Sequence, residues 1–213
     1  PKKIANIFHI PILETGMVLE GGSIDVNGKG SLLTTRQCLL NKQRNPTLSQ
    51  EQIEEKLRVY LGAQKVLWLD RGIAGDDTDG HIDEIARFVD ENTIICALET
   101  NPQDENFLIL KKNHEDLQVL KDQDGNRFNI ITLPMPDPLV IQGQRVPVSY
   151  LNFYIAHTVV IVPTFRCEKD FRALSVLKTC FPNRKVVGVD CVDWAWGLGA
   201  LHCSTQQLPL ARD

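Results

Sequence analysis

Residues 150–189 read YLNFYIAHTVVIVPTFRCEKDFRALSVLKTCFPNRKVVGV, and the order of elements predicted in them indicates the fold class. Residues 150–164 are rich in β-branched and aromatic side chains, and they predict two strands. A helix is predicted over residues 169–180, and the apolar run at 185–189 predicts a further strand. Strand, helix and strand in this order indicate an α/β protein.

The same order of elements is predicted twice more toward the N-terminus. Residues 93–98 and 129–133 predict strands, with a helix at 113–120 between them. Residues 23–34 predict a hairpin, because Asn27-Gly28 is a favoured pair for tight turns. A helix and a strand are expected to follow this hairpin and complete the first of three strand-helix-strand units.

The helix of the first pass has clear start and stop signals. Ser49 and Gln52 have the spacing of a capping box, and Gly62 ends the helix before a strand at 65–69. The sequence identity between the three units is negligible, so the repeat is structural. A further short strand is predicted at residues 4–10, and the proline-rich residues 133–147 predict a long connecting loop.

The length and charge of the chain limit the functions that are possible. The chain has 213 residues, which predicts a single domain over residues 1–213. Its formal net charge is −4, and the absence of a basic stripe argues against nucleic acid as a partner. The sequence predicts no membrane span. The chain begins at Pro1 instead of a methionine, and we expect its N-terminal part to be missing.

Six cysteines are scattered along the chain, without the dense spacing of a disulfide scaffold. Most lie in apolar runs and are expected to be small buried side chains in a reducing compartment, the cytoplasm. Cys203 differs, because the polar residues 204–207 follow it. The local sequence leaves open that Cys203 is one more buried cysteine.

The segment Asp76-Asp77-Thr78-Asp79-Gly80-His81-Ile82-Asp83 offers what a nucleophilic thiol needs. His81 can transfer protons, and the carboxylates can hold a cationic substrate. Asp83 is predicted to share a strand face with His81, whereas His202 is predicted to point away from Cys203. A solvated acidic turn is the alternative. The sequence supports a metal site less well than these two interpretations, because no second histidine stands at ligand spacing.

Further candidates stand beside glycines and near the thiol. Glu20 precedes two glycines and adds a carboxylate, although a surface glutamate at a turn would have the same pattern. Trp194 and Trp196 alternate and offer an aromatic face to a cation, with core packing as the alternative. Thiol, imidazole and carboxylates together indicate attack on a positively charged carbon, such as that of a guanidinium.

Five segments of the chain resemble agmatine deiminases and occur in the order which that family has. Agmatine deiminases belong to the guanidino-group-modifying superfamily, together with the bacterial type of peptidyl-arginine deiminase. The most specific motifs are Gly80-His81-Ile82-Asp83 and His202-Cys203-Ser204-Thr205-Gln206-Gln207. All five segments cover almost the whole chain and lie at residues 19–23, 39–46, 77–83, 149–154 and 201–207.

The resemblance implies a fold and a set of roles. The implied fold is a pentein-type α/β propeller of ββαβ-like units, of which about three of five are expected here. Cys203 matches the nucleophile and His81 the general acid and base. Glu20 and Asp83 match carboxylates that hold the guanidinium. Two further residues are implied to line the substrate site, namely Asp77 and Gly199.

The sequence departs from the family in two places. The family has an Arg-Asp-x-Gly-Pro segment whose aspartate binds the guanidinium, and these 213 residues contain no such segment. The usual triple glycine before the His-Cys pair is replaced here by Gly197-Leu198-Gly199-Ala200.

The implied activity is hydrolysis of agmatine to N-carbamoylputrescine and ammonia through a covalent cysteine amidino-thioether, as in polyamine and putrescine biosynthesis. The alternatives are a peptidyl-arginine deiminase and a catalytically incomplete fragment that binds guanidino compounds or polyamines. A cysteine protease would leave the carboxylates without a role. The expected partner is a small cationic guanidino compound, without cofactor, metal, nucleic acid or membrane, and a homo-oligomer is left open.

Overall fold

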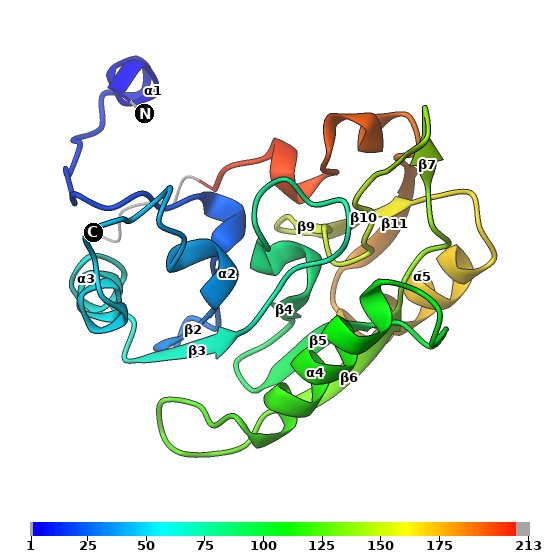
Figure 1. Ribbon diagram of the computed structural model, residues 1–213, viewed down its shortest axis with the longest axis horizontal. Coiled ribbons are helices and arrows are strands. Elements are labelled where there is room, and N and C mark those ends of the chain that lie inside the picture. The colour runs from blue at the N-terminus through cyan, green and yellow to red at the C-terminus, as the bar shows by residue number, and fades with distance from the viewer. Residues whose placement is uncertain (1, 208–213) are drawn as a thin grey trace.

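The computed structural model describes residues 2–207 and contains three similar ββαβ units. Each unit is a three-stranded sheet with one antiparallel and one parallel neighbour pair, and a helix connects the two parallel strands. The sheets lie around the middle of the molecule, with the helices α3, α4 and α5 toward the outside (Figure 1). The predicted α/β class and the repeat of three units are therefore confirmed.

The units follow one another along the chain. The first contains β1 (Asp25–Val26), β2 (Ser31–Thr35), α2 (Arg36–Leu39), α3 (Gln50–Leu61) and β3 (Lys65–Leu69). The second contains β4 (Ala86–Phe88), β5 (Thr93–Leu98), α4 (Asn106–Val119) and β6 (Asn129–Pro134). The third contains β9 (Tyr154–Ile155), β10 (Val159–Thr164), α5 (Lys169–Cys180) and β11 (Lys185–Asp190).

Local signals explain the first unit. The Ser49 side chain accepts from the Gln52 backbone, and the Gln52 side chain accepts from the Ser49 backbone, so the predicted capping box is present. The predicted stop also forms, because Gly62 adopts a left-handed conformation with φ of 70°. The antiparallel pairing of β1 with β2 confirms the predicted hairpin.

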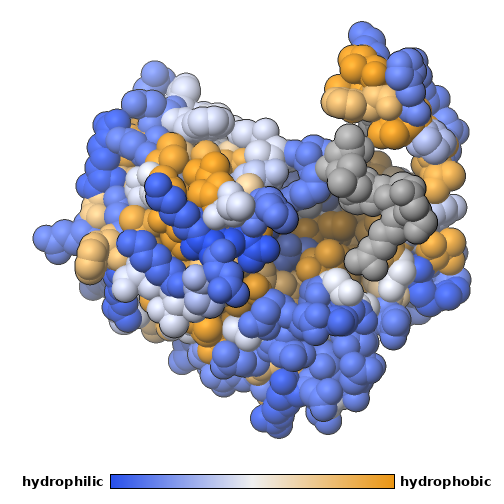
Figure 2. All heavy atoms as spheres, turned by 180° about the vertical axis from the view of Figure 1, so that it is seen from behind, coloured by the Kyte–Doolittle hydropathy of each residue, from blue (hydrophilic) through white to orange (hydrophobic). Residues whose placement is uncertain are grey.

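Two predictions about helices were less accurate. Residues 4–10 were expected to form a strand, but Lys2–Phe8 form the helix α1. Ile4, Ile7 and Phe8 have the three- and four-residue spacing of one helical face, and this face is exposed. Figure 2 shows the helix as a projection at the upper right, with orange, hydrophobic side chains beside blue, hydrophilic ones. The helix α4 begins at Asn106, seven residues before the predicted start at 113.

The core has a large and a small part. The large part joins apolar side chains of all three units with those of the segment between the second and third, such as Tyr150, Leu151 and Phe153. The small part lies in the first unit, where α2 and α3 pack on the sheet, and consists of Leu32, Cys38, Leu39, Ile53, Leu57 and Ala63. The burial of these side chains fixes the positions of the loops that leave each sheet.

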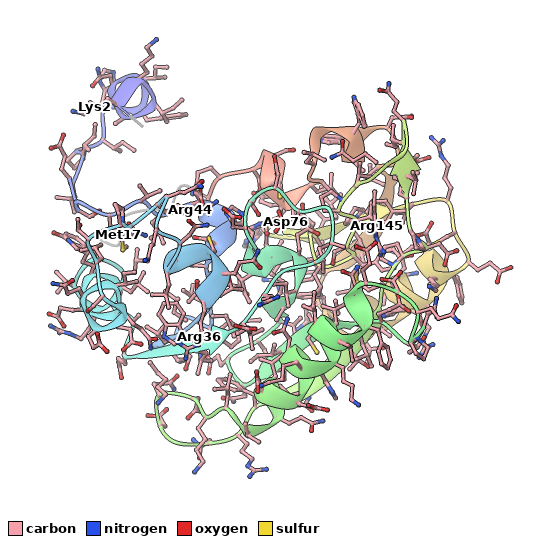
Figure 3. The ribbon with its side chains drawn as sticks, viewed as in Figure 1. Lys2, Met17, Arg36, Arg44, Asp76 and Arg145 are labelled. Atoms are coloured by element: carbon pink, nitrogen blue, oxygen red, sulfur yellow. The ribbon has the colours of Figure 1, made fainter. Side chains whose placement is uncertain are left out.

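The proline-rich segment is a connection, as predicted, but it contains a short hairpin. β7 (Val140–Ile141) and β8 (Gln144–Arg145) pair antiparallel. Arg145 donates to both carboxylate oxygens of Asp104 at 3.0 Å, which ties the hairpin to the start of α4 (Figure 3). Among residues 2–207, no helix has the length and apolar character that crossing a bilayer requires.

Candidate active site

Four short segments, which lie before the first unit, between the first and second units and after the third unit, line one pocket of about 380 Å³. Three of them contain 3-10 helices, which are η1 (Gly21–Ser23), η3 (Trp194–Gly197) and η4 (His202–Ser204). The fourth is the loop before η2 (Ile82–Glu84). The predicted site residues that line this pocket are Glu20, Asp77, His81, Gly199 and Cys203. Trp194 and His202 line it as well.

The sulfur of Cys203 lies among polar side chains at the pocket. Its Sγ is 3.0 Å from Asn152 Nδ2, 3.5 Å from Asp83 Oδ2 and 4.0 Å from Glu84 Oε1. Burial of the sulfur raises the pKa of the Cys203 thiol, and the neighbouring charges of Asp83 and Glu84 raise it further. In this arrangement the thiol is the favoured form of Cys203.

Asp83 is fully buried and connects Cys203 with the neighbouring histidine. Its Oδ2 is 2.7 Å from His202 Nδ1 and accepts from Asn152 Nδ2 at 3.1 Å. Its other oxygen, Oδ1, is buried and has no hydrogen-bond partner among the described residues. A buried carboxylate oxygen without a partner is unusual and indicates a position where a ligand could donate.

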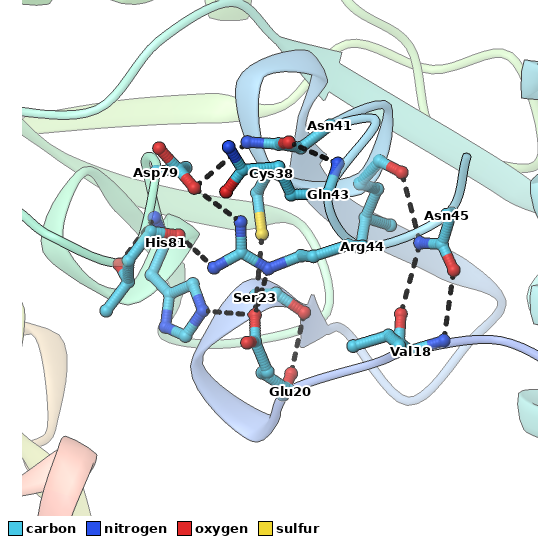
Figure 4. A network of polar contacts seen from close by, with 12 residues as sticks. Val18, Glu20, Ser23, Cys38, Asn41, Gln43, Arg44, Asn45, Asp79 and His81 are labelled. Carbon is cyan, nitrogen blue, oxygen red and sulfur yellow. Dashed lines mark hydrogen bonds and ion pairs between the residues drawn. The ribbon is translucent and has the colours of Figure 1, made fainter.

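Glu20 is the acceptor at the centre of a second polar network (Figure 4). Its Oε2 is 2.9 Å from His81 Nε2 and accepts from Arg44 Nε at 2.8 Å, while Cys38 Sγ lies 3.8 Å away. Burial acts to raise the pKa of Glu20, but the hydrogen bonds from His81 and Arg44 outweigh it and hold the pKa below the ordinary value. Glu20 is therefore ionised and oriented toward His81.

Arg44 also holds the loop that carries His81. Its guanidinium donates to Asp79 Oδ2 at 2.8 Å and to the Thr78 carbonyl at 2.6 Å. Asp76 accepts from the Gly80 backbone at 2.8 Å within the same loop. Part of the acidic segment is thus structural, whereas Asp77 is exposed and lines the pocket.

The two predicted strand geometries at the site were wrong. His81 lies directly before η2 and Asp83 lies within it, so the two residues do not share a strand face. They nevertheless converge, because a Cβ on Gly22 would lie 2.7 Å from His81 Nδ1 and 2.8 Å from Asp83 Oδ2. His202 was expected to point away from Cys203, but both belong to the 3-10 helix η4 and both line the pocket.

Sequence reasoning assigned no role to four residues that shape the site. Asn152 and Arg44 lie in segments that resemble agmatine deiminases, so the motifs contained them without indicating a contact. Glu84 follows Asp83 directly, and its burial was not readable from the sequence. Leu198 stands where the family has a glycine, and it adopts a left-handed conformation with φ of 59°.

Comparison with known proteins places the chain in a family. A family model described as Porphyromonas-type peptidyl-arginine deiminase matches residues 1–209. The protein belongs to this family. An agmatine deiminase of Medicago truncatula is 38% identical over 98% of this chain and 61% of its own length. The predicted resemblance to agmatine deiminases is therefore confirmed.

Solved structures agree with this assignment. An agmatine deiminase of C. jejuni with substrate bound is 38% identical, with a TM-score of 0.89 over 96% of this chain and 60% of that one. The enzyme of Enterococcus faecalis is 35% identical, with a TM-score of 0.91 over 98% of this chain and 62% of that one. The pentein-type fold class is confirmed by this similarity, whereas the five-bladed propeller stays a prediction. The chain spans between 58% and 63% of the length of the curated relatives it matches.

Proposed function

We propose that the protein is an agmatine deiminase in which residues 1–213 form a single guanidino-group-modifying domain. The observation that carries the proposal is the pocket itself, where a thiol, an imidazole and carboxylates meet. Cys203, His81 and Glu20 line it, and Asp83 contacts the sulfur from behind. The names of related proteins support agmatine as the substrate.

The guanidinium would be held by two carboxylates that each have one oxygen without a hydrogen bond in the described part of the chain. Glu20 uses Oε2 for His81 and Arg44, and Oε1 has no hydrogen bond among the described residues. Asp83 uses Oδ2, and Oδ1 is likewise without a partner in the described part of the chain. A guanidinium is planar and presents several N–H donors, so it suits such acceptors.

The reaction begins when the Cys203 thiol gives its proton to His81, and the resulting thiolate attacks the guanidinium carbon and forms a carbon–sulfur bond. The carbon–nitrogen bond then breaks, and His81 protonates the leaving ammonia. Water, deprotonated by His81, attacks the amidino-thioether and breaks the carbon–sulfur bond. N-carbamoylputrescine leaves, and Cys203 is restored. The scheme needs no metal or organic cofactor, because the side chains supply nucleophile and proton transfer.

Substrate binding also provides a way to ionise Cys203. The carboxylates raise the pKa of the thiol in the empty pocket. A bound cation neutralises their field and stabilises the neighbouring thiolate, so its arrival lowers that pKa again. The site is thus expected to become nucleophilic only with a cationic ligand present.

The lining of the pocket favours agmatine over arginine. Among the described residues, the lining contains Glu20 and Asp77 but neither lysine nor arginine. Free arginine carries a carboxylate that would lack a cationic partner, whereas the distal ammonium of agmatine suits Asp77 and the face of Trp194. The cysteines of the described chain are all free, which supports a reducing compartment, the cytoplasm.

A colorimetric assay for ureido products tests the proposal, with agmatine, free arginine and a peptidyl arginine compared in parallel. We expect product from agmatine alone. Quenched reactions should show the amidino adduct on the Cys203 peptide by mass spectrometry, and Cys203→Ser should form neither adduct nor product. The same adduct in Cys203→Ser would overturn the role of this sulfur. Glu20→Gln should lower kcat/KM about 100-fold, and an unchanged value would remove Glu20 from the site.

One observation favours a second candidate, a protein that binds guanidino compounds or polyamines without hydrolysing them. Burial, together with the charges of Asp83 and Glu84, raises the pKa of the Cys203 thiol and so opposes formation of the nucleophilic thiolate. Calorimetry with agmatine separates the two candidates. Heat of binding without any ureido product would support the binding protein, and turnover of agmatine would exclude it.

A further inference from the structure

We propose that Leu198 recognises the hydrocarbon chain of the substrate and makes the pocket selective for guanidinium compounds that carry an apolar chain. The inference rests on the proposed function and deepens it, because it concerns the part of the ligand that the carboxylates of Glu20 and Asp83 do not bind. Leu198 follows η3 directly and lines the pocket.

The pocket offers an alkyl chain few apolar side chains. Within residues 2–207, its lining contains one aliphatic side chain, that of Leu198, and one indole, that of Trp194. The other residues of this lining are glycines or have polar or charged side chains. Since an alkyl chain gains free energy when it leaves water for an apolar surface, Leu198 is the position in this lining that such a chain fits.

The backbone conformation of Leu198 favours glycine over leucine. Its φ is 59° and its ψ is 35°, which is the left-handed region. Glycine adopts this region without strain, whereas a side chain with a Cβ pays for it. Among the non-glycine residues with positive φ in the described chain, Leu198 is the only aliphatic one. Residues in such conformations cluster at functional sites, and a leucine here points to a use for its side chain.

Packing holds the Leu198 side chain in place. The residue is half-buried, and its side chain packs against the large part of the core. Its backbone N–H donates to the Ala195 carbonyl at 3.0 Å, which closes the turn at the end of η3. A side chain that is already ordered loses little conformational entropy when a ligand contacts it. Leu198 therefore presents a preformed apolar surface to the pocket.

The position of Leu198 suits a chain that leaves the attacked carbon. A Cβ on the next residue, Gly199, would lie 2.9 Å from Cys203 Cβ and 3.2 Å from its Sγ, so the backbone directly after Leu198 contacts the nucleophile. Consecutive Cα atoms are only about 3.8 Å apart. An alkyl chain on a guanidinium carbon that faces Sγ can therefore reach the Leu198 side chain.

Calorimetry with methylguanidinium and butylguanidinium tests the proposal, because the two cations have the same charge and differ by three methylene groups. Cys203→Ser serves as the parent protein, so that neither compound forms a thioether. We expect the parent to bind butylguanidinium at least about tenfold more tightly, since one fully buried methylene is worth about fourfold in affinity. In Leu198→Ala and Leu198→Gly this preference should fall to about threefold or less.

An unchanged preference for butylguanidinium in either folded variant would overturn the proposal. Leu198→Gly is the variant that should fold even if Leu198→Ala does not, because glycine removes the backbone strain. Leu198→Met has a similar volume and should keep the preference. Leu108→Ala is the matched control, because Leu108 is an exposed leucine of α4 outside the pocket lining, and it should leave both affinities unchanged. A preference lost in this control, or lost in Leu198→Met, would equally count against Leu198.

These binding measurements do not depend on turnover. If Leu198 sets the preference but wild-type protein releases no ureido product, the proposed deiminase function fails and the role of Leu198 stands. Turnover of agmatine together with an unchanged preference in the Leu198 variants would refute the role of Leu198 alone. A parent protein that binds neither cation would refute both.

Discussion

One buried carboxyl group, Glu84, sets how the surroundings of Cys203 respond to pH. Burial raises the pKa of Glu84 well above its ordinary value of 4.5, and the charge of Asp83 raises it further. The folded protein therefore retains a proton that the unfolded chain releases above that value. The free energy of unfolding is expected to fall as the pH rises toward the folded-state pKa.

Glu84→Gln should remove this dependence while keeping an acceptor for Asn152. We expect the variant to gain stability relative to the wild type as the pH rises from about 4 to about 8, with little difference at the acidic end. Urea unfolding at both values measures the change. Glu115→Gln, on an exposed position of α4, is the control and should follow the wild type. Parallel curves for wild type and Glu84→Gln would show that Glu84 ionises normally.

Residue chemistry was the most predictable part of the site. Cys203, His81, Glu20, Asp77 and Gly199 were predicted from the sequence, and the structure brings them to one pocket. Asn152 was not predicted, because its contact with Cys203 joins residues 51 positions apart and follows from packing alone. The catalytic and binding roles assigned to the five predicted residues stay predictions until the variants are measured.

At the scale of elements, the contact of η1 with η2 brings two parts of the site together. A Cβ on Gly22 would lie within 3 Å of both His81 Nδ1 and Asp83 Oδ2, so this position accepts no side chain without displacing one of them. The close approach of these two 3-10 helices sets the separation between the imidazole and the buried carboxylate.

Gly22→Ala should therefore lower kcat/KM for agmatine about 100-fold, since small displacements of catalytic groups have effects of this size. Gly197→Ala is the control, because Gly197 lines the same pocket and a Cβ there would meet no atom within 4 Å. Steady-state kinetics compares the two variants. If they lose activity equally, crowding at His81 and Asp83 is not the cause.

The cap of α3 gives an element-scale prediction about stability alone. Ser49→Ala removes the acceptor for the Gln52 backbone and should lower the free energy of unfolding by about 1 kcal/mol. The activity toward agmatine should remain, because α3 contributes no residue to the pocket. Chemical denaturation together with the ureido assay measures both. A variant that keeps its stability would show that the capping box adds little here.

Elements with strong local signals were predicted well. The helix at 169–180 and the capped helix after Ser49 have the predicted bounds, because spacing and caps are local properties. The 3-10 helices at the site have no periodicity to read, and the segments around His81 and His202 were treated as strands. At residues 2–8, apolar composition was given more weight than the helical spacing of Ile4, Ile7 and Phe8.

Across the whole molecule, Arg87 connects all three units. Its Nε lies 3.2 Å from Asp25 Oδ1 in the first unit, its backbone belongs to β4 in the second, and its NH1 group donates to carbonyls that lead into the third. The guanidinium is nearly completely buried and lies over the Phe153 ring. Removal of the charge would leave Asp25 and two carbonyls with fewer partners.

Arg87→Met is expected to lower the free energy of unfolding by about 3–5 kcal/mol, as is typical when one partner of a buried ion pair is removed. Arg166→Met is the comparison, because Arg166 pairs with Asp190 at the exposed surface and should contribute much less to stability than Arg87. Urea denaturation of both variants measures the difference. Similar small losses would mean that the buried contacts of Arg87 do not couple the units.

The acidic surroundings of Cys203 have a consequence for how fast peroxide inactivates the protein. Peroxide oxidises the ionised form of a cysteine much faster than the protonated form. Without a ligand the protein keeps the Cys203 sulfur protonated and should resist oxidation by peroxide. With a guanidinium compound bound, the sulfur ionises and should be oxidised faster. Oxidative loss of the protein should then follow how often the pocket is filled, and peroxide treatment with and without a guanidinium salt would reveal it.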